Sequence, residues 1–368
     1  MSVSYGGDSI TFADGSVNSS GFIGHRNRII NGAMMVDQRN AGASVTVNSI
    51  SVSPYITDRF YCNGVTSDGV FTAQQTTTAP AGFTNSLKFT VTTADASIGA
   101  TQRYEFAQVI EGFNFADFNF GSANAKTFTL SFWIRASVTG TYGGAFVNEA
   151  ANRSYVFSYT ISTADTWEYK TITVAGDTTG TWTGATNGYG LRVYWSLGEG
   201  STYQTTAGSW TSGFYLAPTG QTNLIATLNA TMYITGVQLE RGSTASSFEY
   251  RSYGTELALC QRYYWRVKGS DGQYCTVSSG LTTTGTSARH HMPFPVSMRT
   301  GPTISIGGDV YCYDGGNLLI TSLSVLPGLN GALIDFTGSG GGATSGRGSV
   351  ANLGGSTASQ FVQASAEL

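Results

Sequence analysis

The chain has 368 residues, of which 40% are hydrophobic and 12% aromatic, while only 11% are charged. Much of the surface must therefore be covered by Thr, Ser, Asn, Gln and the 48 glycines, a mixture typical of β-strands and tight turns. A net charge of -3 argues against a nucleic-acid partner, because phosphate-binding surfaces depend on clustered Lys and Arg.

Residues 1–25 are expected to form an attachment segment. The sequence ITFADGSV at 10–17 has strand character and a glycine turn, but too few apolar residues for a core of its own. We expect its backbone groups to pair with a partner protein or a neighbouring subunit. The segment has no signal-peptide pattern, and no later stretch reaches the length of a membrane span, so neither membrane insertion nor a standard export leader is expected.

Residues 26–250 show the two-residue period of half-buried strands. In TFTLSFWIR at 127–135, apolar residues alternate with Thr129, Ser131, Trp133 and Arg135. The same period recurs at 87–91, 155–159 and 191–195, with Gly- and Asn-rich turns between. The pattern predicts an all-β fold, a jelly-roll β-sandwich. Trp133, on the polar side of its strand, is expected to be a packing residue, as are Tyr264 and Trp265.

The third region, residues 251–368, is predicted to be a smaller C-terminal β domain. A short helical turn is expected at Glu256–Cys260, following Thr255 as its cap, with a return to strand at Tyr263. Further on, short strands alternate with glycine, and the stretch GSGGGATSGRGS at 338–349 is interpreted as a loop, because it lacks the sequence of a phosphate cradle.

The inventory of catalytic and metal-binding residues is small. None of His25, His290 and His291 lies in a recognisable motif, and the adjacent pair on one strand would face opposite sides. The four cysteines, at 62, 260, 275 and 312, lack zinc-site spacing and are expected to be reduced; a bridge between Cys260 and Cys275 stays open. We expect no metal and no cofactor.

Acidic residues are present, but sequence spacing does not show which two converge. They are Asp58, Glu105, Glu111, Asp165, Glu168, Glu240 and Glu249. A polysaccharide-cleaving enzyme needs such a pair. Asp58 and Glu240, each beside an arginine, are expected in structural ion pairs or turn hydrogen bonds instead. The sequence therefore predicts no catalytic residue and a protein that is not an enzyme.

Aromatic residues in two Gly- and Thr-rich loops are the candidates for carbohydrate binding, since an aromatic ring can stack on a sugar while neutral side chains bond its hydroxyls. They are Trp182, Tyr189, Tyr203, Trp210 and Tyr215, with Asn187 and Gln204 nearby. The ligand is expected to be a neutral or weakly charged surface glycan. The alternative is that these rings fill the core or a subunit interface, where most of the 20 Tyr, 20 Phe and 6 Trp must lie.

Several stretches resemble tail fibre and receptor-binding proteins of tailed bacteriophages. They are SITFADGSVNSS, NRIINGAMMVDQRNAG with YITDRFYC, the long YITGVQLERGSTASSFEYRSYGTELALCQRYYW, PFPVSMRTGPTISI and the terminal ASAEL. The resemblance implies a homotrimer with a jelly-roll similar to carbohydrate-binding modules, located on the virion and assembled in the host cytoplasm. Where related proteins often have proline after F-E-x-R, this chain has Ser252, which makes the junction less rigid.

Three functions are therefore considered. The first is a tail fibre or receptor-binding protein, attached to other virion proteins through residues 1–25 and contacting host surface polysaccharide. The second is a capsid head fibre, cement or decoration protein of the same design. The third, a polysaccharide-depolymerising tailspike, is disfavoured because the chain has few histidines and no long solenoid repeat.

Overall fold

The computed structural model describes residues 26–48, 53–65, 67–269, 275–339, 343–353 and 360–368, together with the backbone of three short strands before residue 26. The chain divides into two compact units, Met1–Tyr253 and Gly254–Leu368. The domain boundary expected from the sequence lies at residue 250, close to this division. Within the described residues, no helix is long and apolar enough to cross a membrane.

The short N-terminal strands pair with one another. They are β1 (Ser4–Gly6), β2 (Ser9–Thr11) and β3 (Val17–Asn18), and they form an antiparallel sheet in the order β1-β2-β3. Pairing with another protein therefore stays a prediction for this segment. Residues 12–16, with the expected glycine turn, and His25 lie outside the described residues.

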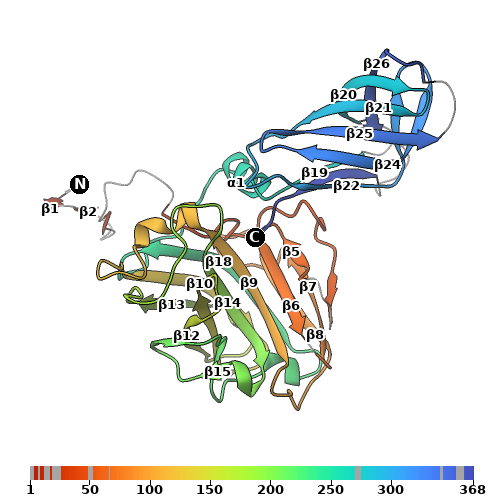
Figure 1. The fold of residues 1–368 in the computed structure, drawn as a ribbon. Helices are drawn as coiled ribbons and strands as arrows, with labels where there is room; N and C mark the ends of the chain where they lie inside the picture. The colour runs from red at the N-terminus through yellow and green to blue at the C-terminus, as the bar shows by residue number, and fades with distance from the viewer. Residues whose placement is uncertain are drawn as a thin grey trace. The chain divides into compact units, whose positions relative to one another are not determined.

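Two antiparallel sheets form a jelly-roll β-sandwich, as the alternation predicted (Figure 1). In spatial order, the six-stranded sheet contains β13 (Glu168–Val174), β10 (Phe128–Ala136), β18 (Thr231–Arg241), β8 (Ser86–Thr93), β7 (Val70–Thr76) and β4 (Val45–Val47). The seven-stranded sheet contains β16 (Trp210–Ser212), β12 (Arg153–Ile161), β11 (Gly140–Val147), β14 (Tyr189–Glu199), β9 (Arg103–Glu111), β6 (Phe60–Val65) and β5 (Tyr55–Thr57). Strands from distant parts of the sequence are thus neighbours.

Short elements complete the first unit. They are the parallel pair β15 (Gln204–Thr205) and β17 (Ala217–Pro218), and four 3-10 turns, η1 (Gly112–Asn114), η2 (Ala116–Phe118), η3 (Ser201–Tyr203) and η4 (Leu224–Ala226).

Aromatic stacking joins the two sheets in the core. Phe106 of β9 lies 5.2 Å from Trp195 of β14, with nearly parallel rings, and 4.4 Å from Phe89 of the opposite sheet. The apolar residues of 127–135 point into this core and are fully buried, which confirms the predicted alternation. Burial of large rings supplies much of the hydrophobic stabilisation of such a fold.

The second unit contains one helix and a closed barrel. The helix α1 (Tyr253–Gln261) begins before the predicted turn, and β19 (Tyr264–Lys268) follows it. A three-stranded sheet has the order β19, β27 (Phe361–Ser365), β22 (Thr303–Gly307). The barrel has the order β20 (Cys275–Thr284), β21 (Ser287–Pro293), β25 (Gly331–Ser339), β24 (Asn317–Pro327), β23 (Val310–Tyr313), β26 (Gly348–Leu353). The glycine-rich stretch 338–349, expected to be a loop, begins within β25 and ends within β26, and its residues 340–342 lie outside the described residues.

Several expectations for single residues of the second unit are confirmed. Tyr264 is buried, and Trp265 is half-buried with its ring 6.0 Å from that of Phe294. All four cysteines are free, so the bridge between Cys260 and Cys275 is not formed.

Candidate functional site

The outward-facing side of the six-stranded sheet carries a row of aromatic rings. Trp133 of β10 is paired in register with Tyr169 of β13, and their ring centroids lie 5.3 Å apart. Tyr233 of β18 is paired with Arg135, two residues further along β10 and on the same side. Tyr169 is 43% exposed, and Trp133 and Tyr233 are partly exposed. We call these three rings the aromatic face.

A hollow of about 430 Å³ opens at one end of the aromatic face. Its aromatic lining consists of Phe83, Trp133, Tyr169, Phe248 and Tyr250. The remaining lining is small or hydroxylic and comes from Ser131, Gly236, Ala245, Ser246 and Ser247. The Phe83, Phe248 and Tyr250 rings pack against one another at 4.9 to 5.5 Å. The hollow therefore combines exposed ring surface with hydroxyl groups.

A bulge in β18 shapes the floor of this hollow. The pairing between β10 and β18 shifts after Ser131, so that β18 has one extra residue there. Gly236 occupies the bulge with a φ of +62°. A Cβ atom at this position would lie 2.6 Å from Phe83 Cζ and 3.1 Å from Trp133 Cδ1. Glycine is required here both for the backbone angle and for the approach of the two rings.

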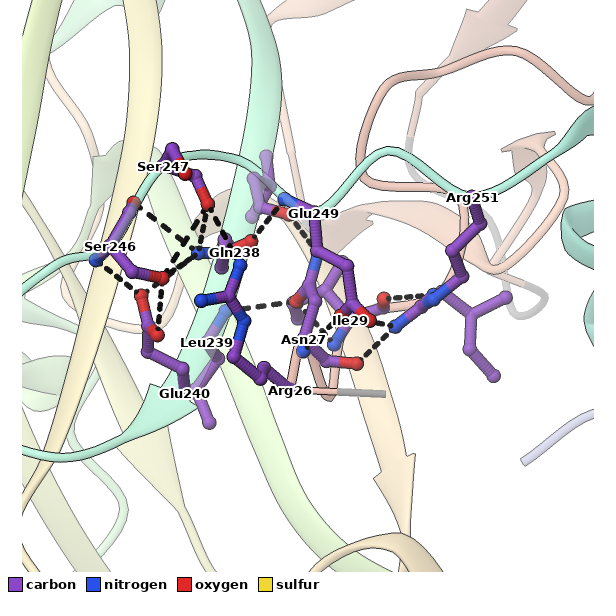
Figure 2. Close-up of polar contacts among 12 residues, drawn as sticks. Arg26, Asn27, Ile29, Gln238, Leu239, Glu240, Ser246, Ser247, Glu249 and Arg251 are labelled. Atoms are coloured by element: carbon purple, nitrogen blue, oxygen red, sulfur yellow. Dashed lines mark hydrogen bonds and ion pairs between the residues drawn. The ribbon is translucent and has the colours of Figure 1, made fainter. Parts of the chain in front are cut away.

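One wall of the hollow is the segment that follows β18, residues 242–251, which we call the strap. The carboxylate of Glu240 accepts hydrogen bonds from the backbone N (2.8 Å) and the Oγ (2.7 Å) of Ser246. Gln238 Oε1 accepts a hydrogen bond from the backbone N of Glu249 at 2.8 Å. Figure 2 shows these contacts along the strap. Buried side chains of β18 thus hold the strap against the sheet.

The strap is also bound to the residues that enter the sandwich. Arg251 donates hydrogen bonds to the carbonyl oxygens of Asn27 and Ile29 (Figure 2). Glu249 Oε2 accepts a hydrogen bond from the backbone N of Asn27 at 2.7 Å, and Asn27 Nδ2 donates to the carbonyl of Val237 at 3.0 Å. The wall is therefore fixed in place, which reduces the entropy lost when a ligand binds.

Two cations lie at the other end of the aromatic face. The Arg135 guanidinium carbon is 5.2 Å from the Tyr233 ring centroid, and Lys88 Nζ is 5.8 Å from it. Arg135 also pairs with Asp165 at 3.3 Å. The Trp167 ring lies 6.1 Å from that of Tyr233. This end of the face is cationic, whereas the hollow is neutral.

The arrangement is suited to binding rather than to proton transfer. The hollow has no carboxylate, histidine or cysteine in its lining. Aromatic faces with adjacent hydroxyl and amide groups bind flat, hydroxyl-rich molecules by stacking and hydrogen bonding.

The loop tryptophans expected to bind carbohydrate are brought together, at 5.4 Å, but in packing contacts. Trp182 and Trp210 both pack edge to face on Phe120, and both are half-buried against the core. Trp182 Nε1 donates to the carbonyl of Thr179 at 3.1 Å, and Trp210 Nε1 donates to that of Ala175 at 2.8 Å. Trp182 also lines a second hollow, of about 230 Å³, so that part of its ring is open to solvent.

The three loop tyrosines do not form one cluster with these tryptophans. Tyr203 lies in η3 and packs on Phe214 at 5.8 Å, with the Arg103 guanidinium 5.1 Å from its ring. Tyr189 begins β14, near Arg192. Tyr215 follows Phe214 and is half-buried. A sugar-binding role for these five residues stays a prediction.

The acidic residues behave mostly as hydrogen-bond acceptors. Asp58 accepts from the backbone N and the side chain of Gln38, and Glu240 binds the strap, as expected. Two buried carboxyls lie on adjacent strands, Glu105 of β9 and Glu199 of β14. Burial raises the pKa of Glu105 to about 6, opposed by Arg103, and burial followed by the charge of Glu105 raises the pKa of Glu199. Neither Glu105 nor Glu199 lines the hollow beside the aromatic face or the hollow at Trp182.

The two adjacent histidines face opposite sides of β21, as predicted. His290 is fully buried in the barrel, and its ring nitrogens contact Ser278 Oγ (3.1 Å) and Ser349 Oγ (2.7 Å). His291 is exposed. Within the described residues, no three His, Cys, Asp or Glu side chains are grouped as metal ligands would be.

Trp133 packs against Tyr169, as expected of a packing residue, and is half-buried. It also lies on the outer side of β10 and lines the open hollow, a role that the sequence did not suggest. The alternation in the sequence already placed it on the polar side of its strand, next to Ser131 and Arg135. Its partner Tyr169 lies more than thirty residues away, so that only strand pairing reveals the pair.

No protein-family model and no curated protein matches the chain. Solved structures with a distant likeness include a phage tailspike domain, a putative sugar binding protein and a carbohydrate-binding module. The tailspike protein 4 enzymatically active domain of bacteriophage CBA120 is 12% identical over 59% of this chain, with a TM-score of 0.31, and the match covers only 22% of that domain. A putative sugar binding protein from Bacteroides thetaiotaomicron is 11% identical over 59% of this chain and all of its own length, with a TM-score of 0.35.

The third is the family 11 carbohydrate-binding module of Clostridium thermocellum in complex with a mixed-linked tetrasaccharide. It is 8% identical over 57% of this chain and all of its own length, with a TM-score of 0.26.

Proposed function

We propose that the β-sandwich binds a surface glycan through the aromatic face and the adjoining hollow. The observation that carries the proposal is the exposed pair of Trp133 and Tyr169 beside a hollow with hydroxylic lining and a rigid wall. A pyranose ring has an apolar face that stacks on such rings and hydroxyl groups that bond to serine hydroxyls.

We further propose that the chain is an adhesive protein on a tailed-phage virion, a tail fibre or receptor-binding protein. The support for this location is the resemblance of the sequence to such proteins. Residues 1–25 would then attach the chain to the particle. Deleting them should leave the melting temperature of the sandwich nearly unchanged and abolish incorporation into virions. Incorporation of the truncated protein would place the anchor elsewhere, and immuno-electron microscopy of intact virions distinguishes a tail from a capsid position.

A homotrimer is part of this proposal. One stacking site contributes on the order of 1 kcal/mol per ring and binds only weakly. Several copies that bind one surface at the same time raise the apparent affinity through effective concentration. Light scattering of the purified full chain measures the mass directly, and a monomer at micromolar concentration would contradict the trimer.

Glycan-array binding and calorimetry with the full chain test the site. Trp133→Ala and Tyr169→Ala should each reduce binding about fivefold or more, since a lost stacking contact is worth on the order of 1 kcal/mol. Phe113→Ala is the matched control, because Phe113 is also exposed, at 57%, but lies outside the aromatic face. Normal binding by both variants, with their folding intact, would refute the aromatic face as the site.

A further inference from the structure

We infer that the ligand is an acidic glycan, in which a carboxylate is bound by Lys88 and Arg135 while a neighbouring sugar occupies the hollow. The inference rests on the proposed function and specifies its ligand class. It departs from the neutral or weakly charged glycan that the sequence suggested.

Strand register places the two cations together. Lys88 of β8 and Arg135 of β10 are both paired with Tyr233, which lies on the strand between them. The three side chains therefore form one row across the sheet, with the tyrosine ring in the middle. Contact of both cations with this ring holds their charged groups over the face.

The cationic row adjoins the stacking site. Arg135 is two residues from Trp133 on the same side of β10, a separation of about 7 Å along a strand. One extended oligosaccharide can therefore stack a ring on Trp133 and Tyr169 and present the carboxylate of an adjacent sugar to the row. The row thus extends the proposed site without a break.

The local charge favours an anion. Within the part of the chain that the structure describes, Lys88 has no acidic partner. Arg135 is paired with Asp165, whose side chain is 55% exposed, so this contact is screened by solvent. Two cations and one acid leave a net charge of +1 on this patch, in a chain whose net charge is -3. A carboxylate would form charge-assisted hydrogen bonds with the ammonium and with the remaining guanidinium donors.

The test compares polygalacturonic acid oligosaccharides with uncharged galactose oligosaccharides of equal length, using the full chain, calorimetry and a glycan array. The acidic ligand should bind the wild type more tightly, and its affinity should fall as salt increases. Lys88→Gln and Arg135→Gln should each reduce acidic-ligand affinity roughly tenfold, the usual effect of one lost charge-assisted hydrogen bond. Neutral-ligand affinity should fall less than acidic-ligand affinity in both variants, because a neutral ligand forms no ion pair with the row.

Lys126→Gln is the matched control, since it removes the same charge from the loop before β10, away from the row. Preference of the wild type for neutral ligands, or equal losses in Lys88→Gln and Lys126→Gln, would overturn the acidic ligand and leave the proposed function standing. Weaker binding of both ligands in Trp133→Ala, together with a loss mainly of acidic-ligand binding in Lys88→Gln, supports both proposals. If the variants change the oligomeric mass instead, the aromatic face is a subunit interface, and both proposals are wrong.

Discussion

Gly236 lies directly against Phe83, so closely that a Cβ atom added to the glycine would be 2.6 Å from Cζ of the ring. The bulge in β18 therefore determines where the ring lies, and the ring in turn lines the hollow. The left-handed backbone of Gly236 thus connects the bulge in β18 with the shape of the hollow.

Replacing this glycine should affect stability and binding together. Gly236→Ala forces a side chain into a left-handed conformation and against an aromatic ring, at a cost of about 2 kcal/mol or more. Urea denaturation should show this loss, and glycan affinity should fall because Phe83 is displaced. Gly254→Ala is the control, since a Cβ there meets nothing within 4 Å and alanine favours its helix. Unchanged stability and affinity in Gly236→Ala would contradict the role of the bulge.

The strap should loosen when its arginine is removed. Arg251 has a side chain only 5% exposed, and Arg251→Ala leaves the carbonyls of Asn27 and Ile29 without this donor. We expect a loss of roughly 2 kcal/mol and faster hydrogen exchange in residues 242–251, measured by mass spectrometry. Among contacts with the described residues, Arg26→Ala removes only a long, exposed one with Ser247, and it should change neither stability nor exchange. If the strap exchanges hydrogen equally slowly in Arg251→Ala and Arg26→Ala, Arg251 does not anchor it.

The loop tryptophans should prove mainly structural. Trp182→Ala and Trp210→Ala each remove a ring packed on Phe120 and an indole hydrogen bond, so we expect losses of about 2 to 4 kcal/mol. If these variants lose glycan binding, the loss should match the fraction of protein that thermal scans show to be unfolded. Stable variants that no longer bind glycan would instead restore the loop site expected from the sequence.

Stability of the barrel should depend on the buried histidine. Burial lowers the pKa of His290 to about 4, from an ordinary value of 6.5. Between these values the unfolded chain binds more protons than the folded one, so stability falls as pH decreases from about 6.5 to 4 and levels off below. The full effect is on the order of 3 kcal/mol.

The measurement is the difference in unfolding free energy between wild type and His290→Leu, plotted against pH. The difference cancels the other titrating groups, including Glu105, whose raised pKa acts in the opposite direction in part of this window. His291→Gln, on the exposed side of the same strand, should retain the wild-type pH dependence. A flat difference curve would mean that His290 has the same pKa in the folded and unfolded states, which would contradict the lowering of its pKa by burial.

Strand alternation in the sequence was sufficient to predict the all-β sandwich, because each half-buried strand must place apolar residues on one side. The same alternation put Trp133 and Arg135 on the outer side of β10, and separated His290 from His291. These are local properties of a chain with a two-residue period, and they hold whatever the strand pairs with.

Only the tertiary structure decided which side chains meet. Trp133 joins Tyr169, and Lys88 joins Arg135 around Tyr233, because β8, β18, β10 and β13 are neighbours in the sheet although they are distant in sequence. Conversely, the sequence left open whether Trp182 and Trp210 face solvent or pack, whereas the structure packs both indoles on Phe120, Trp182 from a loop and Trp210 from the start of β16. Turn composition indicates where a loop lies along the chain, but long-range packing determines which face of a ring remains available to a ligand.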